Sequence, residues 1–124
     1  MSSDARHRLG SSGEELAADH MIARGFQIVE RNYRTRWGEL DIVAFDGRTL
    51  AFCEVKSRRS GGSCGGPFEA LGPSKQARVR KMAGSWLIAR RNRPRAEVVR
   101  FDAIGVTFDS AGRLVCLEHL EGAF

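Results

Sequence analysis

Two short segments place carboxylates among apolar residues: Gly38-Glu39-Leu40-Asp41 and Glu54-Val55-Lys56. Each is typical of a β-strand, because the first continues into Ile-Val-Ala-Phe and the second follows Leu-Ala-Phe-Cys. A hydrophobic strand seldom carries carboxylates without a partner, since an uncompensated buried charge is costly. Three carboxylates and one lysine within one predicted hairpin have the composition of a hard-cation site with a catalytic amine beside it.

The turn between the two strands decides whether these charges meet. Side chains alternate along a strand, so Glu39 and Asp41 share one face, and Glu54 shares a face with Lys56. A two-residue turn would pair Glu39 with Glu54, and a four-residue turn would pair Asp41 with Glu54; both put all four charges on one face. A three-residue turn would move Glu54 and Lys56 to the other face. Because Asp46-Gly47 is a strong hairpin signal, we favour the even-numbered turns.

On either of these registers both faces of the hairpin are largely apolar. The face with the charges would also carry Val43, Phe45, Leu50 and Phe52 near the turn. The opposite face would be apolar throughout, made of Leu40, Ile42, Ala44, Ala51, Cys53 and Val55. A sheet that is apolar on both faces needs covering elements on both sides.

Length and composition indicate one globular domain. The chain has 124 residues, 28% of them charged and 42% hydrophobic, which suits a single core and argues against disorder. The net charge of +5 favours a polyanionic partner. No apolar run reaches membrane-spanning length, and the N-terminus lacks the hydrophobic stretch of a signal peptide, so we expect no membrane partner and a cytoplasmic location.

Local patterns predict the element order α-β-β-β-α-β-β within one domain over residues 11–124. Residues 1–10 are polar and basic, and we expect them to be flexible. A helix is predicted from Ser11 or Ser12 to Arg24, followed by a strand over 26–33 and the charged hairpin. A second helix is predicted over 74–91, and strands over 97–108 and 113–118.

Two acidic residues stand near the start of the first predicted helix. Glu14 and Glu15 each fit a capping box, with Ser11 and Ser12 as the respective caps. Alternatively, one of them is a further carboxylate for a metal ion or its water shell. The residues by themselves favour the cap.

The second helix and its tail form a basic stretch without any acid between Ala70 and Ala96. Such a run is often only a solvated helix face. Together with basic residues near Arg34 and Arg58, its one-sided charge favours contact with nucleic-acid phosphates. Contacts of this kind supply affinity rather than sequence choice. The basic residues of the stretch are Lys75, Arg78, Arg80, Lys81, Arg90, Arg91, Arg93 and Arg95.

Taken together, these motifs resemble those of the YraN family of small bacterial proteins, over nearly the whole chain. The further motifs that support this are Gly10-x-x-Gly13-Glu14-x-x-Ala17, Arg31-Asn32, the stretch from Glu69-Ala70-Leu71 to Lys75, and Arg100-Phe101-Asp102. That family resembles a branch of the PD-(D/E)xK nuclease superfamily, and its motif order is close to that of archaeal Holliday-junction resolvases. Leu40 stands where the signature has proline, as in resolvase-like members.

The resemblance implies an α/β, restriction-endonuclease-like fold, with a mixed β-sheet of about five strands flanked by helices. It implies that Asp41, Glu54 and Lys56 are the signature triad. It also selects Glu14 over Glu15 as the acid of the first helix, against the capping preference. Superfamily membership implies nuclease chemistry, although fold and function can separate.

We therefore predict a Mg²⁺-dependent endonuclease that acts on structured or damaged DNA, as in repair or recombination. Asp41 and Glu54 would bind Mg²⁺, or Mn²⁺ in its place, and the Val55 carbonyl would be a further ligand. Glu14 would bind the metal directly or through water. Lys56 would orient the attacking water or offset the charge that develops on phosphorus. Glu39 would hold the water shell or Lys56. The cations predicted to contact phosphates are Lys75, Arg78, Arg58 and Arg34.

Two alternatives stay open. One is a nucleic-acid-binding module with the same fold and no catalysis, and the other is an accessory subunit of a nuclease. The triad argues against a pure binding module, which needs no carboxylates facing phosphates. Junction cutting would favour a symmetric homodimer.

Overall fold

The computed structural model describes residues 3–60 and 72–124. The element order is the predicted α-β-β-β-α-β-β. The elements are α1 (Ser3–Ala23), β1 (Gln27–Thr35), β2 (Gly38–Phe45), β3 (Thr49–Arg59), α2 (Pro73–Ala89), β4 (Val98–Phe108) and β5 (Leu114–Leu120). Residues 69–71, part of one motif of the resemblance, lie outside the described residues.

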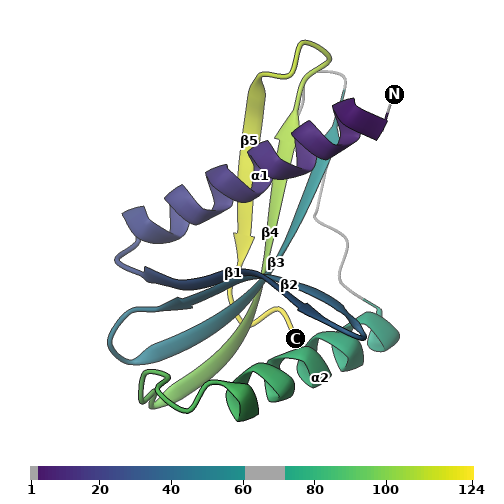
Figure 1. Cartoon of the computed structure of the whole chain (residues 1–124). Helices are drawn as coiled ribbons and strands as arrows, with labels where there is room; N and C mark the ends of the chain where they lie inside the picture. Colours follow the sequence, from purple (N-terminus) through teal and green to yellow (C-terminus); the bar gives the residue numbers. More distant parts are fainter. Residues whose placement is uncertain (1–2, 61–71) are drawn as a thin grey trace.

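The five strands form one mixed sheet in the order β1-β2-β3-β4-β5. β3 and β4 are parallel and are linked through α2, whereas the other neighbouring pairs are antiparallel. α1 and α2 cover opposite faces of this sheet (Figure 1). The predicted fold class is confirmed: an α/β sheet of five strands flanked by helices, consistent with the restriction-endonuclease-like fold.

Two apolar clusters lie on either side of the sheet, as expected for strands that are apolar on both faces. The cluster under α1 packs Ala17 and Met21 against the sheet, and the cluster under α2 is centred on Trp86. The strand residues under α1 include Ile42, Ala44, Ala51, Cys53, Ile104 and Val106. Those under α2 include Leu40, Val43, Leu50 and Phe52. Among the described residues, no helix is long and apolar enough to cross a membrane.

The first helix begins earlier than predicted, because residues 3–10 continue it. Ser11 and Ser12 therefore lie inside α1, and the predicted start and capping box are wrong. Helix caps occupy the boundary, where backbone N–H groups lack partners, and these serines stand more than one turn beyond it. Whether residues 1–10 are flexible stays a prediction.

The hairpin turn has the four-residue form. Phe45 pairs with Leu50, and Ile42 pairs with Cys53, which sets the register of β2 against β3. The Asp46 side chain stabilises the turn by accepting hydrogen bonds from the N–H groups of Arg48 and Thr49, at 2.9 and 2.7 Å.

The predicted alternation of faces along β2 is wrong at the charged end. Leu40 packs under α2 with Val43, while Ile42 packs under α1, so the two-residue period breaks between Leu40 and Val43. On β1, the residue opposite this break is Asn32, which has a positive φ of 56°. Asparagine tolerates that conformation better than most residues. The irregular backbone re-aims the side chains of β2 just before the regular pairing with β3 begins.

A buried polar network joins β4, β5 and α1. Asp102 is fully buried and accepts two hydrogen bonds from Arg100, at 2.8 and 2.9 Å, and one from the Gly122 N–H, at 3.0 Å. His119 lies 2.8 Å from Asp102 and 3.0 Å from His20 of α1. Burial alone would raise the pKa of Asp102, but the hydrogen bonds from His119 and Arg100 outweigh it and lower the pKa.

Candidate metal centre and nucleic-acid interface

Asp41 lies where β2 separates from β3. The regular pairing ends at Ile42 and Cys53, and beyond it the Asp41 carboxylate accepts a hydrogen bond of 2.7 Å from the Val55 N–H. The β1–β2 hairpin and the strands β3, β4 and β5 fork apart on this side of the sheet (Figure 1). At the fork, the Asp41 side chain thus takes the place of a backbone carbonyl as the acceptor for the Val55 N–H. This hydrogen bond fixes the carboxylate beside β3.

Three carboxylates converge at this fork. Glu14 of α1 and Glu39 and Asp41 of β2 each offer an oxygen, and these oxygens all lie within 4.8 Å of one another. Gly13 brings α1 close to β3, because a Cβ at that position would stand 1.7 Å from the Ser57 hydroxyl oxygen. The close approach of the helix puts Glu14 over the end of β2.

Asn32 holds two of the three carboxylates. With its amide nitrogen facing them, it donates hydrogen bonds of 2.9 Å to Glu39 and 2.9 Å to Glu14. Its positive φ belongs to the irregular stretch of β1 opposite Asp41. The sequence motifs did not predict this role for Asn32, although an asparagine within a strand is itself a signal of an unusual backbone.

The surroundings of Asp41 disfavour the negative charge of its carboxylate. Asp41 is only 9% exposed to solvent. Burial, followed by repulsion from Glu54, raises its pKa to about 8 from the ordinary 3.8, and Glu14 and Glu39 add to the rise. The hydrogen bond from Val55 opposes the shift without overcoming it. A bound divalent cation would remove this unfavourable energy.

Glu54 approaches the site from the other face of the sheet. In β3, Ala51, Cys53 and Val55 belong to the α1 side, so Glu54 lies with Phe52 on the α2 side. The expectation that all four charges share one face is therefore wrong, because β2 loses its alternation and β3 keeps it. Glu54 and Asp41 remain close enough to repel each other, since both stand at the fork.

Lys75 provides the partner of Glu54. Its ammonium nitrogen lies 3.0 Å from a Glu54 oxygen, whose side chain is 13% exposed. The structure places Lys75 at this carboxylate, near the start of α2, and its predicted contact with phosphate stays a prediction. Lys56 follows Glu54 on the same face of β3; it is exposed and forms no hydrogen bond or ion pair with the described part of the chain.

The other predicted cations are dispersed around this site. Arg34 is almost fully exposed and lies 3.6 Å from Glu39. Arg58 donates to the Thr107 hydroxyl at 3.2 Å and lies 3.8 Å from Glu118, so its guanidinium is held against β4 and β5. Arg78 is exposed on α2. Their contacts with phosphate stay predictions, as does the Val55 carbonyl as a metal ligand.

The comparisons with known proteins show the family of this chain. The model of a family described as "Uncharacterised protein family UPF0102" matches residues 13–106, which include every carboxylate of the fork. This chain belongs to the UPF0102 family, the YraN family of the sequence resemblance.

UPF0102 relatives span nearly the whole chain. The UPF0102 protein of Anaeromyxobacter dehalogenans is 46% identical over 121 residues, covering 98% of this chain and 87% of the relative. That of Frankia casuarinae is 46% identical, covering 97% of this chain and 98% of the relative. The protein of Frankia alni is 45% identical over the full length of both chains. The family's description names no activity, so function must be argued from the site.

Proposed function

We propose that this UPF0102 protein is a divalent-metal-dependent endonuclease that hydrolyses phosphodiester bonds in DNA. The observation that supports the proposal most is Asp41, a buried carboxylate on which Glu14, Glu39 and Glu54 converge from three elements. Such a concentration of negative charge is unfavourable unless a cation is bound.

The donor set fits Mg²⁺, with Mn²⁺ as a substitute. Both prefer oxygen ligands, and Mg²⁺ needs only one or two carboxylates besides its waters. Asp41 and Glu54 would hold the ion with the Val55 carbonyl, and Glu14 and Glu39 would bind it directly or through its waters. When bound, the ion would polarise a phosphoryl oxygen and lower the pKa of a water.

The side chains around the ion have separate tasks in this proposal. Lys56, exposed beside Glu54, would face the phosphate and offset the charge that develops on phosphorus. Lys75 would hold the Glu54 carboxylate in place through its 3.0 Å contact. Arg78 and the exposed cations that follow on α2 would contact the DNA backbone.

The same features favour DNA recognised by shape over a sequence-specific site. Backbone contacts supply affinity without sequence information. Structured or damaged DNA, as met in repair and recombination, is therefore the proposed substrate class. A homodimer would suit the two-fold symmetry of a junction.

A cleavage assay tests this function. The pure protein is incubated with duplex, nicked, flapped and four-way DNA and with matching RNA, in Mg²⁺, in Mn²⁺ and in chelator. We expect metal-dependent cutting of at least one DNA structure and none in chelator. If nothing in the panel is cut while DNA is bound, the non-catalytic binding module or accessory subunit is the better description.

The variant Lys56→Met separates chemistry from binding, because it keeps the apolar stem and removes the ammonium. Cleavage should fall roughly 10²-fold or more, while affinity for metal and DNA changes little. Arg113→Met, an exposed cation on the β4–β5 turn, is the matched control. Equal cutting rates for wild type and Lys56→Met would refute the assigned role.

A further inference from the structure

A hollow, the first of two that adjoin each other, lies at the opposite end of α2 from the carboxylates. It has a volume of about 550 Å³ and lies between the end of α2, the segment that follows it, and the first residues of β3 and β4. The volume is in the usual range for small-molecule sites. Among its lining residues are three arginines and no carboxylate: Leu50, Leu87, Arg91, Arg93, Pro94, Arg95, Ala96 and Val99.

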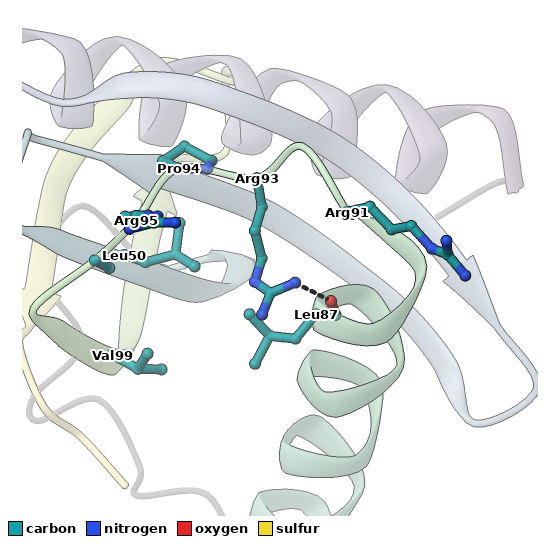
Figure 2. A pocket seen from close by; sticks show the side chains of 8 residues that line it. Leu50, Leu87, Arg91, Arg93, Pro94, Arg95 and Val99 are labelled. Carbon is teal, nitrogen blue, oxygen red and sulfur yellow. Dashed lines mark hydrogen bonds between the residues drawn. The ribbon is translucent and has the colours of Figure 1, made fainter.

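The floor of this hollow is apolar and open. Leu50 is buried, but its neighbour across the parallel ladder, Val99, is 48% exposed. Figure 2 shows Leu50, Leu87 and Val99 around the hollow, with Arg93 and Arg95 on two sides of it. An apolar floor with cations at its rim suits a ligand that has one flat apolar part and one anionic part.

Two guanidinium groups have donors available for an anion. Arg93 uses one terminal nitrogen, Nη1, which donates to the carbonyl oxygens of Leu87, at 2.6 Å, and Arg90, at 3.1 Å. Its Nε and Nη2 edge remains, and that edge has the geometry for bidentate contact with phosphate. Arg95 is exposed and forms no hydrogen bond or ion pair with the described part of the chain.

The end of α2 does not repel an anion as a bare helix C-terminus would. The last carbonyl groups of a helix carry partial negative charge. Here Arg93 binds two of them, so the hollow faces a helix end that is already compensated (Figure 2).

The adjoining hollow differs from the first in having a carboxylate in its lining. It has a volume of about 430 Å³ and shares Arg91, Arg93 and Pro94, but it also contains Glu30. The Glu30 carboxylate accepts hydrogen bonds from Trp86 and from Arg90, at 2.7 to 2.8 Å. Because Arg90 and Trp86 already donate to Glu30, they are not available to an anionic ligand, and the Glu30 carboxylate would repel one. An anion should therefore bind in the first hollow, which has no carboxylate in its lining.

We propose that the first hollow binds a nucleoside monophosphate unit, with the phosphate on Arg93 and Arg95 and the base on Leu50, Leu87 and Val99. Guanidinium groups match phosphate oxygens, and a base offers an apolar face for the floor. Free nucleotide and a nucleotide within a strand share this chemistry.

The position of the hollow also predicts where it would lie on DNA, an extension that rests on the proposed function. Lys75 stands at the carboxylates and Leu87 at the hollow, twelve residues apart on α2. At a rise of about 1.5 Å per residue they are separated by roughly 18 Å along the helix. With about 3.4 Å per nucleotide, a strand that follows α2 would place in the hollow a nucleotide about five positions from the scissile phosphate.

The test is a titration of isotope-labelled protein, followed by NMR, in chelator so that no metal contributes. Deoxyadenosine monophosphate should shift the amide signals of Leu50, Leu87 and Val99, and inorganic phosphate and deoxyadenosine should each bind more weakly. Arg95→Ala should weaken nucleotide binding roughly tenfold. Arg91→Ala is the matched control: its guanidinium points away from Leu50 and Val99 in Figure 2, and its binding should change less than twofold.

Equal weakening by Arg91→Ala and Arg95→Ala would overturn the site, as would the absence of shifts at Leu50 and Val99. If phosphate alone binds as tightly as the nucleotide, the hollow is an anion site and the proposal for the base is wrong.

Single strands of four and ten nucleotides then distinguish free from strand-borne nucleotide. The ten-nucleotide strand, which can span both sites, should bind more tightly than the four-nucleotide strand, which can occupy the hollow alone, and Arg95→Ala should weaken the binding of both. If only free nucleotide responds, the placement on DNA is refuted and the nucleotide site stands. Since these titrations need no metal, failed cleavage would refute the nuclease proposal without touching this one.

Discussion

At the scale of single residues, the carboxyl group of Asp41 has the most unusual environment in the site. The raised pKa follows from burial beside other carboxylates, and it links the charge of Asp41 to stability. In the unfolded chain the group loses its proton near its ordinary pKa of 3.8, while the metal-free folded protein keeps it up to about pH 8. Asp41 therefore contributes most to stability below pH 4 and loses that contribution as the pH rises to 8.

We expect Asp41→Asn to flatten this dependence. The amide keeps an acceptor for the Val55 N–H and has no charge to bury. In chelator the variant should match wild type near pH 4 and exceed its unfolding free energy by about 1–3 kcal/mol at pH 9, measured by urea denaturation.

The difference between variant and wild type matters here, because His20 also titrates. Burial, followed by the neighbouring His119, lowers the His20 pKa, which makes stability rise with pH below 6.5 in both proteins. Adding Mn²⁺ should stabilise wild type and leave Asp41→Asn unchanged. A variant less stable than wild type at pH 9 would contradict the environment described for Asp41.

Asn32 offers a second residue-scale prediction, because its side chain and its backbone can be tested apart. Asn32→Gly removes the amide that holds Glu14 and Glu39 but allows the positive φ of 56°. Asn32→Ala removes the same amide and places a Cβ in an unfavourable conformation.

Both Asn32 variants should lose about 10–100-fold in Mn²⁺ affinity by calorimetry, as when the hydrogen-bond partners of metal ligands are removed. Only Asn32→Ala should also lose about 1–2 kcal/mol of stability relative to Asn32→Gly. Unchanged Mn²⁺ affinity in Asn32→Gly would show that the amide does not position the carboxylates.

At the scale of elements, the contact between α1 and β3 decides where Glu14 lies. The Gly13 position leaves no room for a side chain, since an added Cβ would be 1.7 Å from the Ser57 Oγ and 3.0 Å from its Cβ. The Ser57 hydroxyl is buried without a hydrogen-bond partner in the described structure. Removing this hydroxyl should therefore reduce the free energy of unfolding very little.

Gly13→Ala should push α1 away from the sheet and cost about 1–3 kcal/mol by thermal or urea denaturation, despite the higher helix propensity of alanine. Mn²⁺ affinity should fall as well, because Glu14 moves with the helix. Ser57→Ala in the same chain removes the closer atom and should recover part of both losses. If Gly13→Ala proves as stable as wild type, the helix is less closely packed than described.

At the scale of the whole molecule, α2 presents the basic surface on the side of the sheet opposite α1. Arg78, Arg80 and Lys81 are exposed there, and no acid occurs between Ala70 and Ala96. The net charge of the chain is +5, so long-range attraction also favours DNA.

DNA affinity should therefore fall steeply with salt, with log K changing by about −0.9 per unit of log salt for each phosphate contacted. Arg78→Ala should make this slope less steep by about 0.9, the value for one phosphate contact, and should weaken binding to unrelated sequences equally. Arg113→Ala, on the β4–β5 turn at the far end of the sheet from α2 (Figure 1), should leave the slope unchanged. Affinity independent of salt would exclude a phosphate-binding surface.

Patterns of neighbouring residues were enough to predict much of this protein. Apolar runs and turn residues predicted the element order and the four-residue alternative for the hairpin, because these depend on backbone preferences and two-residue periodicity within a short segment. The combined motifs also identified the family, and with it the mixed sheet. The choice of Glu14 over Glu15 as a site candidate came from the resemblance and not from spacing, which favoured the cap.

The tertiary structure alone decided how the charges are arranged. Alternation in β2 fails opposite Asn32, and the Asp41 carboxylate lies near Glu14 of α1, while Glu54 pairs with Lys75 of α2. That break depends on a contact between strands and on a backbone conformation that no local pattern in β2 records. The start of α1 was likewise misjudged, because Ser11 and Ser12 suit a cap only where a helix begins. The hollow at Arg93 and Arg95 requires α2, β3 and β4 to meet, and residues so distant in the chain become neighbours only in the folded protein.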